Sequence, residues 1–213
     1  MTEENNDLIY ISIDCESTGI AIENVDILEI GAIIDCIPAS GKKEDLIPLE
    51  NLPIFHAYFL PPDGIFKGEP QGLAMNANIL QTIADKNKII KEDNSKKDLF
   101  IHPQKLGSKF KNWMLNSEFY FKAEKDNAFT FVAGKNFDKF DRQLLGAKTD
   151  LFKHVVFRGA AIDPGVLLLK PGMTRMPGLD DCKKICGVDG EVTHYALDDA
   201  FDVIECLRHH YTK

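Results

Sequence analysis

The sequence lacks a long apolar segment, an excess of basic residues and a paired set of cysteines. In 213 residues no apolar run approaches the roughly 20 residues of a membrane span, so we expect no membrane association. Five scattered cysteines predict reduced thiols rather than a disulfide framework. Cys182 and Cys186 lie one helical turn apart without a second pair at zinc-ligand spacing, so we favour helix packing. The acidic, polar start does not resemble a secretory signal, which favours a cytoplasmic location.

The charge of the chain limits the class of ligand. There are 33 aspartates and glutamates against 25 lysines and arginines, a formal net charge of −8. Proteins that hold long duplex nucleic acid through many phosphate contacts have strongly basic surfaces, and the charge argues against that class. Short single strands remain compatible, because cations held by acidic residues can contact phosphate in place of lysines.

The order of predicted elements indicates the fold class. A chain of this length can bury a sizeable core, so we expect a single domain over residues 1–213. Three apolar runs with short connections predict an antiparallel meander: 8–13, 27–34 and 55–60. Helical and strand patterns then alternate, with helices at 73–83, from Pro103, from about Phe137, at 179–186 and at 195–209, and strands at 128–133 and 154–157. This order predicts an α/β fold with a mixed central sheet flanked by helices.

One stretch stands apart by its composition. Asp85–Asp98 is rich in lysines and acidic residues. We expect a charged, solvated loop inserted into the domain, since such runs are usually exposed connections. An arm that contacts substrate is the alternative.

Two carboxylates follow the first predicted strand. In extended backbone Asp14 and Glu16 project from the same face, while Cys15 turns away. Like charges this close are costly unless a cation or a shared proton offsets them. The pair therefore indicates a metal site, with a solvated acidic pair at the end of a loop as the alternative.

Two aspartates fall on apolar faces of predicted helices. Asp141 lies on the same stripe as Phe137 and Leu144, and Asp199 shares the apolar side of the last helix with Val203. A carboxylate directed at a core is costly unless it is paired or bound to metal. These two aspartates are therefore functional candidates, whereas their neighbours Asp138 and Asp198 are expected on the surface.

A histidine precedes the same last helix. His194 lies about one residue before it, where the chain can bring the imidazole toward the cavity that Asp199 faces. Without the aspartates, such a histidine would be interpreted as an ordinary helix-start residue.

Three groups of residues thus follow one another along the chain: Asp14–Gly19, Asn136 with Phe140 and Asp141, and His194 with Asp199. Together they resemble the three motifs of the DEDDh exonucleases, a family with a ribonuclease-H-like fold that includes polymerase proofreading subunits and oligoribonucleases. The similarity runs from about Leu8 to Leu207. It includes Gly72–Asn76, which resembles the family's segment under the terminal base.

The resemblance implies a set of site residues. Four acids would hold two divalent cations, Mg²⁺ or Mn²⁺, which prefer hard oxygen ligands: Asp14, Glu16, Asp141 and Asp199. His194 would take the proton from the attacking water. The expected substrate contacts are the backbone amides of Ser17 and Thr18, together with Met75, Asn76 and Asn136. A core position for Met75 and a helix cap at Asn136 are equally compatible with the sequence.

The function implied is 3′-to-5′ exonuclease activity on the 3′ ends of single-stranded DNA or short RNA, releasing nucleoside 5′-monophosphates. The resemblance leaves a DNA polymerase partner and a homodimer open. One alternative is a phosphotransferase of the haloacid-dehalogenase type, which also begins with an acid pair but leaves His194 unexplained. The other is a catalytically silent binding or scaffold module for a polymerase or nucleic-acid complex. The complete set of four acids and a histidine favours the exonuclease.

Overall fold

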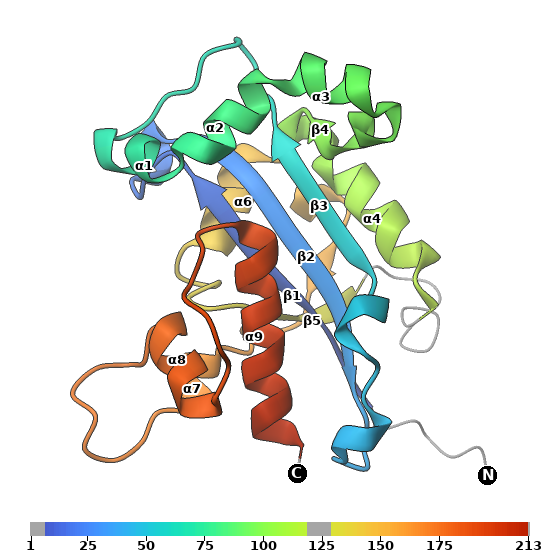
Figure 1. The fold of residues 1–213 in the computed structure, drawn as a ribbon, viewed down its shortest axis with the longest axis vertical. Helices are drawn as coiled ribbons and strands as arrows, with labels where there is room; N and C mark the ends of the chain where they lie inside the picture. Colours follow the sequence, from blue (N-terminus) through green and yellow to red (C-terminus); the bar gives the residue numbers. More distant parts are fainter. Residues whose placement is uncertain (1–6, 119–128, 213) are drawn as a thin grey trace.

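The computed structural model describes residues 7–118 and 129–212. In these residues six strands form one mixed sheet in the order β4-β3-β2-β1-β5-β6 (Figure 1). An antiparallel meander makes up its first half: β1 (Leu8–Ser17), β2 (Ile27–Ile37) and β3 (Ile54–Phe59). Three short strands join in parallel pairs: β4 (Phe100–Ile101), β5 (Phe129–Ala133) and β6 (Val156–Phe157). The predicted α/β fold with a mixed sheet is confirmed.

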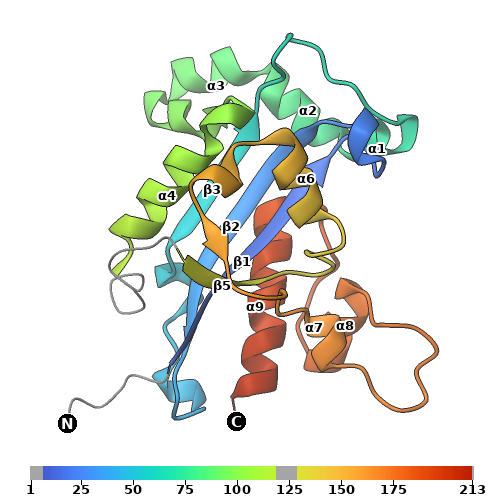
Figure 2. The ribbon, with the colours of Figure 1, turned by 180° about the vertical axis from the view of Figure 1, so that it is seen from behind.

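Helices cover both faces of the sheet (Figures 1 and 2). One face packs on α9 (Ala196–Tyr211), where Tyr10 and Ile33 of the sheet meet Leu207. The other face packs on α4 (Leu106–Asn116) and α6 (Asp141–Lys148). Side chains of a strand alternate between faces, so β1 directs Ile11 and Ile13 to this second core and its even-numbered residues to α9.

The remaining elements are short. Five further helices are described: α1 (Pro70–Met75), α2 (Ala77–Ala84), α3 (Lys86–Glu92), α7 (Pro164–Leu167) and α8 (Leu179–Cys186). Single turns of 3-10 helix occur at Ile22–Asn24, Lys43–Asp45, Leu49–Asn51, Pro103–Lys105 and Leu151–Lys153, and a longer one, η4, at Asn94–Leu99. None of the described helices combines the length and apolar character that a membrane crossing requires.

Two helices differ from the sequence prediction. The helix expected over 73–83 is broken at Asn76, whose buried side chain donates from Nδ2 to the carbonyl oxygen of Ser17 at 2.8 Å. The helix expected from Phe137 begins only at Asp141, because residues 135–140 form a turn. At both helix boundaries a side chain contacts β1: Asn76 at the break and Asp141 at the start of α6.

The charged stretch Asp85–Asp98 is mostly helical rather than an irregular loop. It consists of α3 and most of η4, and residues 91–98 are exposed. Asp93 starts the second of these helices, since its side chain accepts a hydrogen bond from the backbone amide of Ser95 at 3.0 Å. Lysine and glutamate are good helix formers, so the composition that indicated exposure also permitted a helix.

All five cysteines lie in the described residues, are outside disulfide bonds and are buried. Cys182 and Cys186 of α8 pack with Cys206 of α9 in a small apolar cluster. Burial raises the pKa of the Cys182 thiol to about 11. These residues therefore serve as packing side chains, as the spacing predicted.

A buried polar network joins β1, β2 and the end of α9. Asp35 accepts hydrogen bonds from the Tyr10 hydroxyl at 2.7 Å and from the Arg208 guanidinium at 2.6 Å and 3.1 Å. Asp35 is inaccessible to solvent and Arg208 is nearly so. Each charge is thus matched by its partner, which is the condition for burying it.

We expect Asp35→Ala to lower the free energy of unfolding by about 3–5 kcal/mol, because it leaves a buried guanidinium without its counterion. Urea denaturation followed by circular dichroism measures the change. The matched control is Asp98→Ala, which breaks an exposed ion pair with Lys109 and should leave the denaturation midpoint almost unchanged. Equal midpoints for the two variants would contradict the role of this network.

Candidate active site

The end of β1 lies beside the start of α9 (Figure 1). The predicted acids come together there, since the charges of Glu16, Asp141 and Asp199 all act on Asp14. Asp14 and Glu16 lie on the face of β1 that α9 covers, as does Ser12, whose hydroxyl donates to the carbonyl oxygen of Ala200 at 2.8 Å. Glu16 is 8% exposed and Asp14 is half-buried. The alternation of the strand therefore directs both carboxylates toward the first turn of α9.

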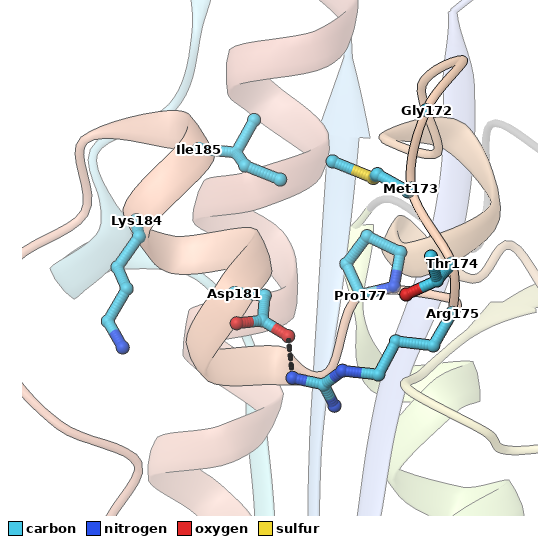
Figure 3. Close-up of a pocket in the computed structure, with 8 residues that line it drawn as sticks. All are labelled: Gly172, Met173, Thr174, Arg175, Pro177, Asp181, Lys184 and Ile185. Carbon is cyan, nitrogen blue, oxygen red and sulfur yellow. Dashed lines mark hydrogen bonds and ion pairs between the residues drawn. The ribbon is translucent and has the colours of Figure 1, made fainter.

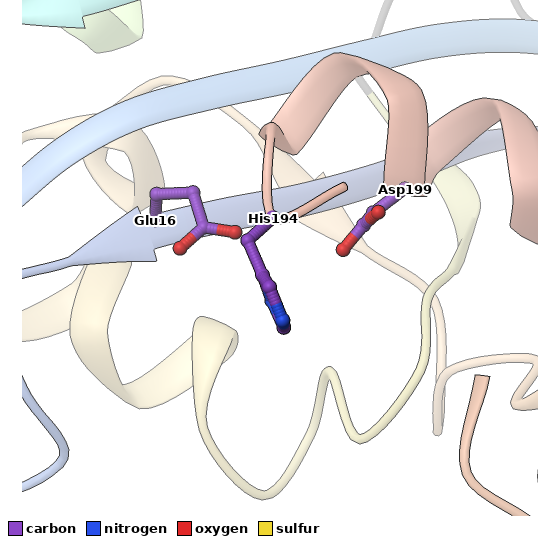
Figure 4. Close-up of side chains that lie close together, drawn as sticks. All are labelled: Glu16, His194 and Asp199. Carbon is purple, nitrogen blue, oxygen red and sulfur yellow. The ribbon is translucent and has the colours of Figure 1, made fainter. Parts of the chain in front are cut away.

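The segment entering α9 adds an imidazole and a third carboxylate. His194 lies two residues before the helix, with a left-handed φ of 56°, and Asp199 lies in its first turn. One ligand atom each from Glu16, His194 and Asp199 lies within 4.8 Å of the other two. Figure 4 shows the imidazole between the two carboxylates. An uncommon backbone conformation at a non-glycine residue such as His194 often accompanies a functional constraint.

Asp141 approaches the end of β1 from the helix on the opposite face of the sheet. It is the first residue of α6 and is 4% exposed. Its Oδ1 accepts a hydrogen bond from the backbone amide of Cys15 at 3.1 Å. The residue between Asp14 and Glu16 is thereby tied to a fourth acid, so carboxylates from β1, α6 and α9 converge.

Burial and mutual repulsion disfavour ionisation of these acids. Burial raises the pKa of Glu16 to about 8, with further increases from Asp199 and a compensating hydrogen bond from Asn76. Burial also raises the pKa of Asp141 to about 7 and that of Asp199 to about 7. The pKa of Asp14 is raised by burial first and by the charges of Asp141, Asp199 and Glu16 next. For Asp14 and Glu16 the negative charges of the neighbouring site acids add to the effect of burial, whereas for Asp141 and Asp199 burial is the main cause.

The donor set fits a divalent cation. Oδ1 of Asp199 is buried and has no hydrogen-bond partner, although a buried polar atom normally has one. A cation near it would satisfy this oxygen and offset the repulsion within the group. Carboxylate oxygens are the ligands that Mg²⁺ and Mn²⁺ prefer.

A cavity of about 260 Å³ opens beside the acids. It is lined by Glu16 and Ser17 at the end of β1 and by Met75 and Asn76 at the break between α1 and α2. Met75 is 55% exposed, so the alternative that placed it in the core was wrong. Asn76 is buried, and its Oδ1 has no hydrogen-bond partner.

Two predicted substrate contacts lie outside the lining of this cavity. The backbone amide of Thr18 donates to the carbonyl oxygen of Asp26 at 2.9 Å, and the buried Thr18 hydroxyl is engaged by Asp26 and Lys67. Asn136 is exposed with a left-handed φ of 58°, and its side chain caps no helix. Its Oδ1 accepts a hydrogen bond from Lys135 at 3.0 Å instead.

The sequence prediction missed Glu69, which lines the same cavity. Its two carboxylate oxygens accept hydrogen bonds from the backbone amides of Ile20 at 2.9 Å and Ala21 at 3.2 Å. Gly72 lets α1 approach this turn, since a Cβ there would lie 2.5 Å from the backbone of Thr18. The available signal was Glu69-Pro70, an acid followed by proline at a helix start.

A second cavity, of about 440 Å³, is formed by the Gly172–Pro177 loop and α8 (Figure 3). None of the predicted site residues lines it. The Arg175 guanidinium, which faces it, is paired with Asp181 at 3.0 Å. Arg175 and Asp181 therefore neutralise each other at this cavity, and the predicted site residues lie elsewhere, near the end of β1.

Comparison with known proteins identifies the fold. No family model matches the chain, and no curated protein matches it in sequence. Among solved structures, the zinc-bound complex of Escherichia coli exonuclease I with single-stranded DNA has a TM-score of 0.58 and 13% identity over 94% of this chain. The complex of that enzyme with a 5cy-dT13 oligonucleotide has a TM-score of 0.57 and 12% identity over 94%. Exonuclease I from Methylocaldum szegediense has a TM-score of 0.56 and 14% identity over 95%.

Each alignment spans 40% of the exonuclease I chain, so this protein corresponds to about two fifths of those structures. At this level of identity the likeness concerns the fold. The chain has the fold of the matched part of the exonuclease I structures, which confirms the ribonuclease-H-like class expected from the motifs.

The raised pKa values predict how pH affects stability. Glu16, Asp141 and Asp199 hold protons more tightly in the folded than in the unfolded chain, so the metal-free protein loses stability as pH rises from about 4 to about 8. A divalent cation held by the ionised acids would offset this loss. We expect millimolar Mg²⁺ to raise the Tm, relative to EDTA, more at about pH 8.5 than at about pH 5.5.

Differential scanning fluorimetry measures these four Tm values. The control is the double variant Glu16→Gln, Asp199→Asn, in which the Mg²⁺ effect should disappear at both pH values. A Tm increase of equal size at both pH values in the wild type would contradict a cation site made of these acids.

Proposed function

We propose that this chain is a metal-dependent 3′-to-5′ exonuclease that hydrolyses phosphodiester bonds at the 3′ ends of single-stranded DNA or short RNA and releases nucleoside 5′-monophosphates. The proposal starts from the fold, which is that of exonuclease I. The observation that carries it is the meeting of Glu16, His194 and Asp199 within 4.8 Å, with Asp14 and Asp141 beside them.

The four acids would hold the cations, and Glu16 and Asp199 are the two that the geometry brings nearest to the histidine. Bound divalent cations supply charge that stabilises a phosphate under attack and lowers the pKa of water. Residues of the chain would then provide the proton acceptor. His194 is exposed at the mouth of the site, where its imidazole nitrogen can accept the proton of the attacking water.

The cavity beside the acids would take the terminal nucleotide. Met75 presents an exposed thioether that can pack on a base. Asn76 offers the unpartnered Oδ1, and Ser17 lines the wall next to Glu16. We assign Thr18 a supporting role, because its amide and hydroxyl hold the turn that forms this wall. Asn136 remains a predicted contact for the chain beyond the terminal nucleotide.

Two alternatives receive less support. A phosphotransferase of the haloacid-dehalogenase type would give His194 no catalytic role. The position of His194 beside Glu16 and Asp199 therefore argues against this class. A silent scaffold module has no need for four acids kept together at the cost of raised pKa values. A polymerase partner, a dimer and the single-domain organisation stay predictions.

The defining experiment is degradation of a 5′-labelled single strand, as DNA and as RNA, with Mg²⁺, Mn²⁺ or EDTA. We expect a ladder that shortens from the 3′ end, requires the cation and disappears in Asp14→Ala. The matched control is Asp138→Ala, which removes an exposed aspartate paired with Arg142 on the surface and should degrade the strand normally. No cleavage of either strand by the wild type would favour the binding module.

A second variant tests the histidine. We expect His194→Ala to lower kcat by about a hundredfold or more, because the water loses its proton acceptor, while the Mg²⁺-dependent rise in Tm is retained. His209→Ala, on an exposed histidine at the end of α9, is the control and should retain full turnover. Loss of the Mg²⁺ effect in His194→Ala would instead make the imidazole a metal ligand.

A further inference from the structure

A fifth carboxylate lies beside the site, and the proposed chemistry does not use it. Glu29 of β2 pairs in register with Glu16 of β1 and is 1% exposed. Its Oε1 lies 2.6 Å from Nε2 of His56 on β3. Its Oε2 accepts a hydrogen bond from the backbone amide of Ala196 at 3.1 Å. Both oxygens are therefore engaged by protein groups, which distinguishes Glu29 from the acids assigned to the cation.

The amide that Glu29 binds belongs to the first residue of α9. The first amides of a helix lack partners within the helix, and Tyr195, the N-cap of α9, provides no side-chain cap. Glu29 supplies the missing acceptor from a strand 167 residues away in sequence. A negative charge is also favourable at a helix N-terminus because of the helix dipole. The contact therefore secures the start of α9 to the centre of the sheet.

Two neighbouring contacts hold the same turn of helix. Gly31 lies two residues after Glu29 on the same face of β2, and a Cβ there would lie 2.4 Å from the backbone of Leu197. On β1, the Ser12 hydroxyl donates to the carbonyl oxygen of Ala200. The contacts at Ala196 and Ala200 flank Asp199 on either side. The position of the Asp199 carboxylate is thus set by β1 and β2 together.

We propose that Glu29 is a positioning residue for the active site. Through the Ala196 amide it fixes the first turn of α9, and with it Asp199 and His194, against the acids of β1. His56 holds the Glu29 carboxylate in the orientation that reaches this amide. The inference rests on the proposed function, in which a displacement of about 1 Å at the reacting groups costs up to a hundredfold in rate.

The test compares Glu29→Ala with Glu29→Gln. The glutamine can still accept the Ala196 amide hydrogen bond and still contact His56, whereas the alanine can do neither. We expect Glu29→Ala to lower kcat at least tenfold with KM within about twofold, since the ground-state contacts to the nucleotide are unchanged. We also expect it to weaken Mn²⁺ binding in isothermal titration calorimetry, and Glu29→Gln to restore both quantities to within about threefold.

Asp35→Asn is the matched control. Asp35 is also a buried acid on β2 that contacts α9, but it binds Arg208 in the last turn of the helix rather than the first. This variant should lose stability while its folded fraction keeps the wild-type kcat and Mn²⁺ affinity. A general loss of packing would instead lower kcat in Asp35→Asn as much as in Glu29→Ala, and that result would overturn the proposal.

Wild-type kcat and Mn²⁺ affinity in folded Glu29→Ala would also overturn it. If Glu29→Ala does not fold, His56→Ala replaces it. The His56 side chain is 21% exposed, and its loss removes the group that orients Glu29 together with one ring contact to Tyr58. The same decrease in kcat and Mn²⁺ affinity is then expected, and unchanged values overturn the proposal.

If the wild type proves inactive, the proposed function fails, and the Mn²⁺ titrations alone decide whether Glu29 positions the acids.

Discussion

Repulsion among carboxylates at the end of β1 is the constraint on which the rest of this structure depends. Asp14, Glu16, Asp141 and Asp199 come together with limited access to water. Burial raises the pKa of each, and the neighbouring site acids raise the pKa of Asp14 and Glu16 further. Such a group is unfavourable unless cations or protons neutralise it. The fold must therefore supply free energy elsewhere to keep these side chains in place.

Two cores on opposite faces of the sheet provide that free energy. One core is formed with α4 and α6, the other with α9. The site lies at the edge where both layers meet β1, so each layer can deliver an acid: Asp141 from α6 and Asp199 from α9. Polar contacts through the sheet then set the position of each helix. Cys15 binds Asp141 through its amide, and Glu29 binds the start of α9.

Much of the fold could be predicted from local patterns. The alternating and continuous apolar runs of the first 60 residues predicted the antiparallel meander, because strand periodicity and short connections are local properties. Helix boundaries were less predictable. The break at Asn76 and the late start of α6 at Asp141 depend on contacts with β1, from segments distant in sequence. The charged stretch at Asp85–Asp98 was predicted as exposed but not as helical.

The sequence by itself determined which residues are candidates for the chemistry, since an acid-x-acid pair and acids on apolar helix faces can be recognised without the structure. Their convergence, and the part played by their neighbours, was decided only by the tertiary structure. Glu29 accepts a hydrogen bond from the Ala196 amide, 167 residues away. The backbone amide of Thr18 is already bonded within the turn that Thr18 stabilises. Such roles depend on which backbone groups lack a hydrogen-bond partner within their own helix or strand. The packing of the sheet against the helices decides which side chain reaches these groups, and no local sequence pattern encodes that packing.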